Sequence, residues 1–137
     1  MEFKVTRRDL ELVAAARHVI ESNYREGWHH MGAAIRTSGG KIYTGIHLEA
    51  NVGRIAVCAE PIALANAILA GKHNYDTIVA VKHPNPEKNR KEFEIASPCG
   101  MCREIITDYD PGTKVIIQVD GKLKKVLMID LLPHKFV

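Results

Sequence analysis

The chain has 137 residues, of which 46% are hydrophobic and 26% are charged, a composition typical of soluble globular proteins and too apolar for intrinsic disorder. This length predicts one domain, residues 1–137, with a core that needs no disulfide bonds. Nineteen lysines and arginines against sixteen acidic residues give a net charge of +3. That charge is too small to indicate nucleic acid or an anionic membrane as a partner.

The sequence also argues against export and membrane insertion. Its apolar runs are shorter than the roughly 20 residues that span a bilayer, and the charged residues 1–10 do not lead into the apolar stretch of a secretory signal. We therefore expect a cytoplasmic protein with no membrane partner. The three cysteines are an odd number, which favours metal binding or catalysis over disulfide bonds in that compartment.

The first half of the chain predicts one helix and one hairpin. Thr6 and Asp9 form an N-terminal capping pattern, and apolar residues then recur at helical spacing, which predicts a helix over residues 6–24. Residues 31–36 and 41–48 flank a Thr-Ser-Gly-Gly turn and predict two paired strands.

The second half predicts two more helices and three strands. Residues 58–70 are Ala-rich and apolar all round, which predicts a fully buried helix that ends at Gly71. Downstream, the pattern indicates a central strand (77–81), a basic loop (83–94), a helix (99–108) and a hairpin (115–119 with 123–128). This order predicts an α/β fold of three layers, α/β/α, around a mixed sheet of about five strands.

Two short segments at predicted helix starts carry the chemistry. Cys99 and Cys102 are three residues apart, so both sulfurs lie on one face of a helical turn, within reach of one zinc ion. Cys58 opens a different helix and would supply a third thiolate. Three protein ligands leave the fourth position open for water, which is typical of catalytic zinc. The sequence therefore predicts a Zn²⁺ site with an open position.

Glu60 follows Cys58 by two residues and would lie beside that open position. A buried carboxylate there can take a proton from water and deliver it to a substrate nitrogen, as a general base and then a general acid. This arrangement predicts hydrolytic deamination. Three thiolates more than neutralise Zn²⁺, so the two helix N-termini and the nearby Arg54 and Arg103 are candidates for offsetting the excess charge.

The sequences Cys-Ala-Glu at 58–60 and Pro-Cys-Gly-Met-Cys at 98–102 resemble the zinc signature of the cytidine deaminase superfamily. The all-cysteine version is similar to that of the small, usually tetrameric deaminases of free nucleosides, which include cytidine deaminase and blasticidin S deaminase. The resemblance covers nearly the whole chain. It implies attack at C4 of a cytosine ring, a uracil product, Glu60 as the proton shuttle and a homotetrameric assembly.

The resemblance also implies substrate contacts, with departures from the family pattern. Family members tend to hold the ribose with an Asn-x-Glu pair, whose positions are occupied here by His47 and Glu49, and to pack an aromatic residue on the pyrimidine where this chain has His29. Phe136 matches a C-terminal Phe that can reach a neighbouring subunit's active site. Pro61 stands where many cytidine deaminases have an Arg that tempers the thiolate charge.

Four functions are consistent with these patterns. Deamination of cytidine or deoxycytidine leads, and deamination of a cytosine-bearing antibiotic such as blasticidin S comes second because of the departures at positions 47 and 61. A polynucleotide editor ranks third, since the net charge is small and aromatic residues are few for a single-strand groove. The fourth is a non-enzymatic module with a structural zinc. We expect a small-molecule nucleoside as substrate and no nucleic-acid partner.

Overall fold

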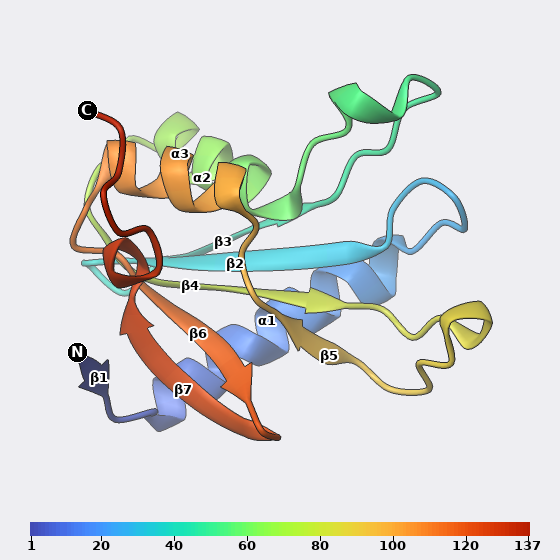
Figure 1. Cartoon of the computed structure of the whole chain (residues 1–137), viewed down its shortest axis with the longest axis horizontal. Coiled ribbons are helices and arrows are strands. Elements are labelled where there is room, and N and C mark those ends of the chain that lie inside the picture. The colour runs from blue at the N-terminus through green and yellow to red at the C-terminus, as the bar shows by residue number, and fades with distance from the viewer.

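The computed structural model describes residues 1–137 and contains three helices and seven strands (Figure 1). The helices are α1 (Arg7–Asn23), α2 (Ala59–Leu69) and α3 (Gly100–Tyr109). The strands are β1 (Glu2–Phe3), β2 (Met31–Thr37), β3 (Ile42–Ile46), β4 (Tyr75–Lys82), β5 (Glu94–Ala96), β6 (Lys114–Val119) and β7 (Lys122–Leu127). Three short 3₁₀ helices are η1 (Gly53–Ile55), η2 (Pro86–Lys88) and η3 (Met128–Leu131).

The strands form one mixed sheet in the order β1-β7-β6-β4-β2-β3, with β5 also paired to β4. Only β4 and β6 are parallel, and α3 lies in the crossover that a parallel pair requires. The predicted α/β/α fold is confirmed, although the sheet has seven strands instead of about five. The two unpredicted strands, β1 and β5, contain two and three residues, which is too few to show a periodic pattern.

Helices cover both faces of the sheet (Figure 1). On one face, α1 packs through Leu12 and Ile20 against residues such as Val79. On the other face, α2 and α3 share a core that includes Leu64 and Ile106. Because both faces are covered, the central strands β2 and β4 are almost wholly buried, which explains their continuous apolar sequences. No helix combines the length and apolar character needed to cross a membrane.

Helix α1 begins where the sequence predicts. The Thr6 hydroxyl oxygen accepts a hydrogen bond from the Asp9 backbone N–H, and the Asp9 carboxylate accepts one from the Thr6 backbone N–H. This reciprocal capping satisfies donors that the first turn of a helix otherwise leaves free.

Helix α2 differs from the prediction that it is fully buried. Its inner side is buried through residues such as Ala63 and Leu64, but Leu69 is 85% exposed. Ala65 and Ala70 are exposed as well. The expectation of full burial is therefore wrong for the single chain, because only one side of α2 faces the sheet.

Helix α2 lies close to β3 because residue 45 is a glycine. A Cβ atom at Gly45 would lie 2.8 Å from the carbonyl oxygen of Ala59, so only a residue without a side chain allows this approach. Ala59 is the first residue of α2 and directly follows Cys58. The contact therefore sets the position of the residues that open the helix.

Candidate metal centre

The three cysteines converge at the starts of α2 and α3, which lie side by side (Figure 1). Cys58 Sγ lies 3.6 Å from Cys99 Sγ, and Cys99 Sγ lies 3.5 Å from Cys102 Sγ. All three sulfurs lie within 4.8 Å of one another. Tetrahedral zinc with Zn–S bonds of about 2.3 Å places its sulfur ligands about 3.8 Å apart. The spacing of the cluster fits a zinc ion.

Both helices begin in a way that suits thiolate ligands. Cys58 and Cys99 are the N-cap residues of α2 and α3, both have extended backbone conformations, and neither side chain makes a capping hydrogen bond. The free N–H groups of a first helical turn carry a positive partial charge that stabilises a neighbouring anion. The backbone N–H groups of Met101 and Cys102 also lower the pKa of the Cys99 thiol.

The ionisation of the cluster indicates what it can hold. Burial raises the pKa of the Cys58 and Cys102 thiols. Burial alone would also raise the pKa of Cys99, but hydrogen bonds from backbone N–H groups lower it. Three thiolates at this spacing would repel one another, so the ionised form of the cluster needs a bound cation as its counter-charge. Three soft sulfur donors at tetrahedral spacing favour Zn²⁺.

Glu60 lies in the first turn of α2, and 4% of its surface is exposed. Burial raises the pKa of its carboxyl group, and hydrogen bonds from its own backbone N–H and from Cys102 offset part of that rise. The carboxyl group is thus buried beside the cysteine cluster and has a raised pKa. A group with these properties can both accept and release a proton during a reaction.

Three of the candidate substrate residues lie together, His29 just before β2 and His47 and Glu49 just after β3. His29 Nδ1 donates a hydrogen bond to the His47 carbonyl oxygen at 2.9 Å, and His47 Nε2 lies 3.6 Å from Glu49 Oε2. Two backbone hydrogen bonds join Leu48 to Val57, and this pairing holds the segment next to the start of α2. The structure therefore brings all three predicted residues to the neighbourhood of the cysteine cluster.

His47 has a free nitrogen. Its Nδ1 atom is buried without a hydrogen-bond partner. Burial lowers the pKa of His47, Glu49 opposes that shift, and the neighbouring His30 and His29 add to it. A neutral imidazole with an unpartnered ring nitrogen can accept a hydrogen bond from a substrate group.

Aromatic rings surround His47, which the sequence does not predict. The His30 ring lies 5.4 Å from the His47 ring, centroid to centroid, and the rings of Tyr24 and His83 stack at 3.7 Å. Tyr24 also lies 6.2 Å from His30. These residues come from three separate segments, so no local pattern in the sequence indicates that they meet.

The two candidate arginines do not hydrogen-bond to a sulfur. Arg54 is exposed on η1. The Arg103 guanidinium donates hydrogen bonds to the carbonyl oxygens of Pro98 and Leu131, both at 2.8 Å, and to Ser97 Oγ at 3.3 Å. Arg103 thus ties the segment before α3 to the C-terminal part of the chain, and its role in charge balance stays a prediction.

We expect Arg103→Gln to weaken zinc retention by about tenfold, because loss of a group that orients a ligand segment typically costs tenfold or more in metal affinity. Competition with a chromogenic chelator measures this. Arg54→Gln removes the same charge without breaking a hydrogen bond, so it is the matched control. Equal losses of zinc retention in both variants would assign the effect to charge alone. Unchanged zinc retention in both variants would contradict both the orienting role and the charge-balancing role.

Phe136 does not reach the cysteine cluster of its own chain. It is 83% exposed, and the preceding Lys135 forms ion pairs with Glu104 and Asp108 of α3. The C-terminus consequently lies beside α3 (Figure 1).

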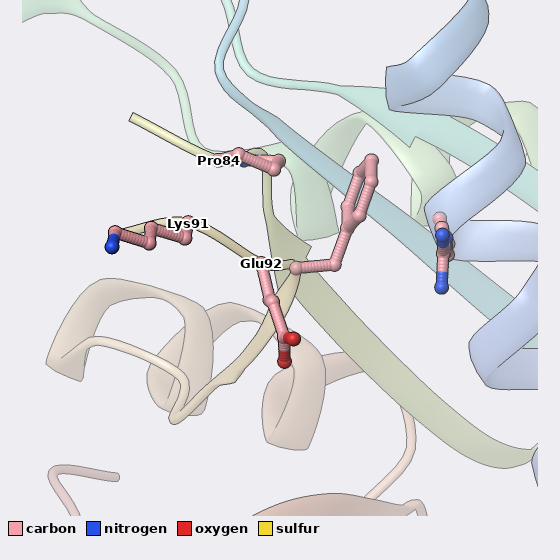
Figure 2. A pocket seen from close by; sticks show the side chains of 5 residues that line it. Pro84, Lys91 and Glu92 are labelled. Carbon is pink, nitrogen blue, oxygen red and sulfur yellow. The ribbon is translucent and has the colours of Figure 1, made fainter. Parts of the chain in front are cut away.

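The cysteine cluster is partly open to solvent in the single chain, because Cys99 is exposed while Cys102 and Glu60 are buried. None of the cavities in the structure is lined by a cysteine or by Glu60. Figure 2 shows one of these cavities, of about 390 Å³, which is lined by Arg17 of α1 and by residues between Pro84 and Phe93. In a single chain, a substrate at the cysteines would therefore be exposed to solvent on one side.

Residues 6–118 match the family model described as the cytidine and deoxycytidylate deaminase zinc-binding region. The chain belongs to this family. It is 46% identical to a blasticidin-S deaminase of Bacillus cereus, over 98% of this chain and 96% of that protein. It is 31% identical to a probable cytidine deaminase of Dictyostelium discoideum, over 77% of this chain and 67% of that protein.

Solved structures agree with this family. The fold matches the crystal structure of a cytidine deaminase from Burkholderia pseudomallei with a TM-score of 0.73 and 27% identity, covering 93% of this chain and 98% of that one. The matched family region and the fit of the cysteine cluster to zinc lead to the same chemistry. The protein is a zinc-dependent deaminase.

Proposed function

We propose that the chain, as one domain of residues 1–137, hydrolytically removes the amino group of a cytosine-containing nucleoside, with cytidine and deoxycytidine as the leading substrates. The products are the corresponding uracil nucleoside and ammonia. The observation that carries this proposal is the convergence of three cysteine sulfurs beside the buried Glu60. The cytidine deaminases among the similar proteins and structures support the substrate class.

In this proposal Cys58, Cys99 and Cys102 hold the metal. A bound zinc ion supplies Lewis acidity, which makes water a nucleophile at neutral pH. Thiolate ligands of this kind need a reducing compartment, so we propose a cytoplasmic location.

Glu60 moves the protons. It takes one proton as water attacks C4 of the ring and gives that proton to N3. It then takes the second proton from the new hydroxyl group on C4 and gives it to the exocyclic nitrogen, so that the C4 carbonyl forms as the C4–N bond breaks and ammonia leaves. The carboxyl group suits this work because it is buried, so its protons pass between water and substrate instead of exchanging with bulk solvent. We assign His29, His47 and Glu49 to the sugar and the base.

A cytosine-bearing antibiotic such as blasticidin S is the second candidate substrate. The 46% identity to a blasticidin-S deaminase over 98% of this chain favours it. His47 also favours this second substrate. A neutral imidazole cannot offer both the carbonyl and the amide group of the Asn that cytidine deaminases tend to use for ribose.

A single assay tests the proposed function. The zinc-loaded protein is incubated separately with cytidine, deoxycytidine, cytosine and blasticidin S, and the loss of the ring amine is followed by ultraviolet absorbance and by ammonia release. We expect about one zinc per chain, turnover of at least one nucleoside and none of free cytosine, which lacks the sugar. No ammonia from any of the four would support a structural zinc instead.

We also propose that the chain forms a homotetramer in which a neighbouring subunit closes the open cysteine cluster. Several large apolar side chains are exposed on and near the two helices that carry the cluster, with exposed fractions of 85% for Leu69, 73% for Met101 and 63% for Ile55. A neighbouring subunit that covers these side chains would remove their apolar surface from water, which favours association. Phe136 is free to reach across such an interface.

Phe136→Ala tests this assignment. We expect it to lower kcat/KM by about tenfold, the effect of removing one buried aromatic side chain from an interface, with a shift toward smaller species in light scattering. Leu10→Ala is the control, because Leu10 is also an exposed apolar residue but lies on α1, on the other face of the sheet. If Phe136→Ala changes neither kcat/KM nor the size of the assembly, Phe136 has no role at the interface and is only an exposed terminal residue.

A further inference from the structure

A cavity that no hydrophobic residue lines is found at the opposite end of α2 from the cysteines. Its volume is about 400 Å³, and it lies between two turns, residues 37–41 and 71–74. The second turn follows the end of α2, so the 11 residues of that helix place about 16 Å between the cavity and the metal centre. The cavity shares no residue with the candidate substrate residues or the cysteine cluster.

The lining of this cavity is rich in positive charge and contains no acidic or apolar side chain. Lys41, Lys72 and His73 line it together with the hydroxyl groups of Thr37 and Ser38. Neither lysine forms an ion pair with any carboxylate of the chain. Their charges are therefore free to interact with an anion.

Backbone groups add further hydrogen-bond donors. The N–H groups of Gly39, His73 and Asn74, all in residues that line the cavity, make no hydrogen bond within the chain. Two of them are consecutive, which is the arrangement that forms anion-binding concavities in turns. They follow Gly71, whose φ of +78° reverses the chain at the end of α2.

We propose that this cavity binds the phosphate groups of a small anion of the inorganic pyrophosphate type. Sites for organic ligands are mostly apolar, so a lining without one apolar residue indicates a compact ion. A tetrahedral oxyanion accepts several hydrogen bonds at once, and those from lysine ammonium groups are strengthened by charge. This site is separate from the one that carries the proposed deamination.

Calorimetric titration of the zinc-loaded protein with sodium pyrophosphate at low ionic strength tests the proposal. We expect saturable binding with one site per chain, and a loss of at least about tenfold in affinity in Lys41→Gln/Lys72→Gln, since each lysine gives a charge-assisted hydrogen bond. Lys41→Arg/Lys72→Arg keeps the charges and should retain most of the affinity.

Lys88→Gln/Lys91→Gln is the matched control. It removes the same charge from two exposed lysines of the loop between β4 and β5, of which Lys91 lines the cavity shown in Figure 2, and we expect unchanged binding. The proposal is overturned if the wild-type chain does not bind pyrophosphate, if the Lys41/Lys72 variant binds as wild type, or if the control loses binding instead. Binding of a short single-stranded oligonucleotide without binding of pyrophosphate would also overturn it. Deaminase activity is measured in parallel, and its loss or retention does not bear on this site.

Discussion

Glu60→Gln should lower kcat for deamination by about 10³-fold, because removal of a general acid and base typically costs 10² to 10⁴ in rate. Gln has the same shape as Glu and cannot carry a proton, so the buried first turn of α2 should stay intact. We therefore expect the zinc content to remain at about one ion per chain and the circular dichroism spectrum to be unchanged.

The control for this variant is Glu11→Gln, which neutralises an exposed carboxylate on α1. It should leave kcat unchanged within about twofold, as expected for a surface substitution away from any site. If Glu60→Gln deaminates at the wild-type rate, Glu60 is not the proton shuttle. If it loses its zinc, the fall in rate reports the metal and not the proton transfer, so zinc content and kcat are measured on the same preparation.

The second large effect is a loss of stability, and it is expected on substitution of Asp9 at the start of α1, away from the metal centre. Its side chain is completely buried, with Arg36 Nη2 at 2.8 Å from Oδ1 and Lys125 Nζ at 3.0 Å from Oδ2. Arg36 also pairs with Asp76, which in turn lies near Lys114. The network joins the start of α1 to the sheet beneath it.

Asp9→Asn should lower the free energy of unfolding by about 3 to 5 kcal/mol, because it leaves the buried Lys125 without a counter-charge and takes one of two carboxylates from the buried Arg36. Asp130→Asn is the control, since Asp130 pairs with the N-terminal amine on the surface and exposed pairs contribute about 1 kcal/mol or less. Urea unfolding of the zinc-saturated proteins measures both. A difference of under about 1 kcal/mol between the two variants would contradict the role of Asp9.

The same network predicts a pH dependence. Burial alone would raise the pKa of Asp9, but hydrogen bonds from Arg36, from the Thr6 backbone N–H and from Lys125 lower it to about 2. The pKa is lower in the folded than in the unfolded chain, so this contribution is present above about pH 4 and is lost as the pH falls toward 2. The stability difference between wild type and Asp9→Asn should shrink over that range, and a constant difference would contradict this.

The parts of the fold that the sequence predicts are those set by local patterns. Thr6 and Asp9 locate the start of α1 because a capping box lies within one turn of chain. The hairpin of β2 and β3 and the buried strand β4 follow from turn residues and apolar runs. The outer side of α2 could not be predicted in this way, because composition does not tell whether a covering surface comes from the same chain or from another.

The metal centre was predictable in its residues but not in its geometry. Cys99 and Cys102 share one turn, whereas Cys58 lies 41 residues before Cys99, and the prediction that the three meet rests on the need for a third ligand at a second helix start and on the motif resemblance. What brings them together is tertiary packing, including the close contact of α2 with Gly45. The partner of Arg103 at Leu131 is 28 residues distant, and no pattern in the sequence indicates such a contact.

Cys58 and Cys99 occupy N-cap positions that serine, threonine, asparagine or aspartate fill in most helices. Neither sulfur caps its helix, so if both bind zinc as proposed, withdrawal of the cation leaves both helix starts without a stabilising partner. The folded population of the enzyme is then coupled to metal supply. A cell that runs short of zinc should clear this protein by proteolysis faster than a zinc-replete cell does, and its abundance would follow the metal without any change in gene expression.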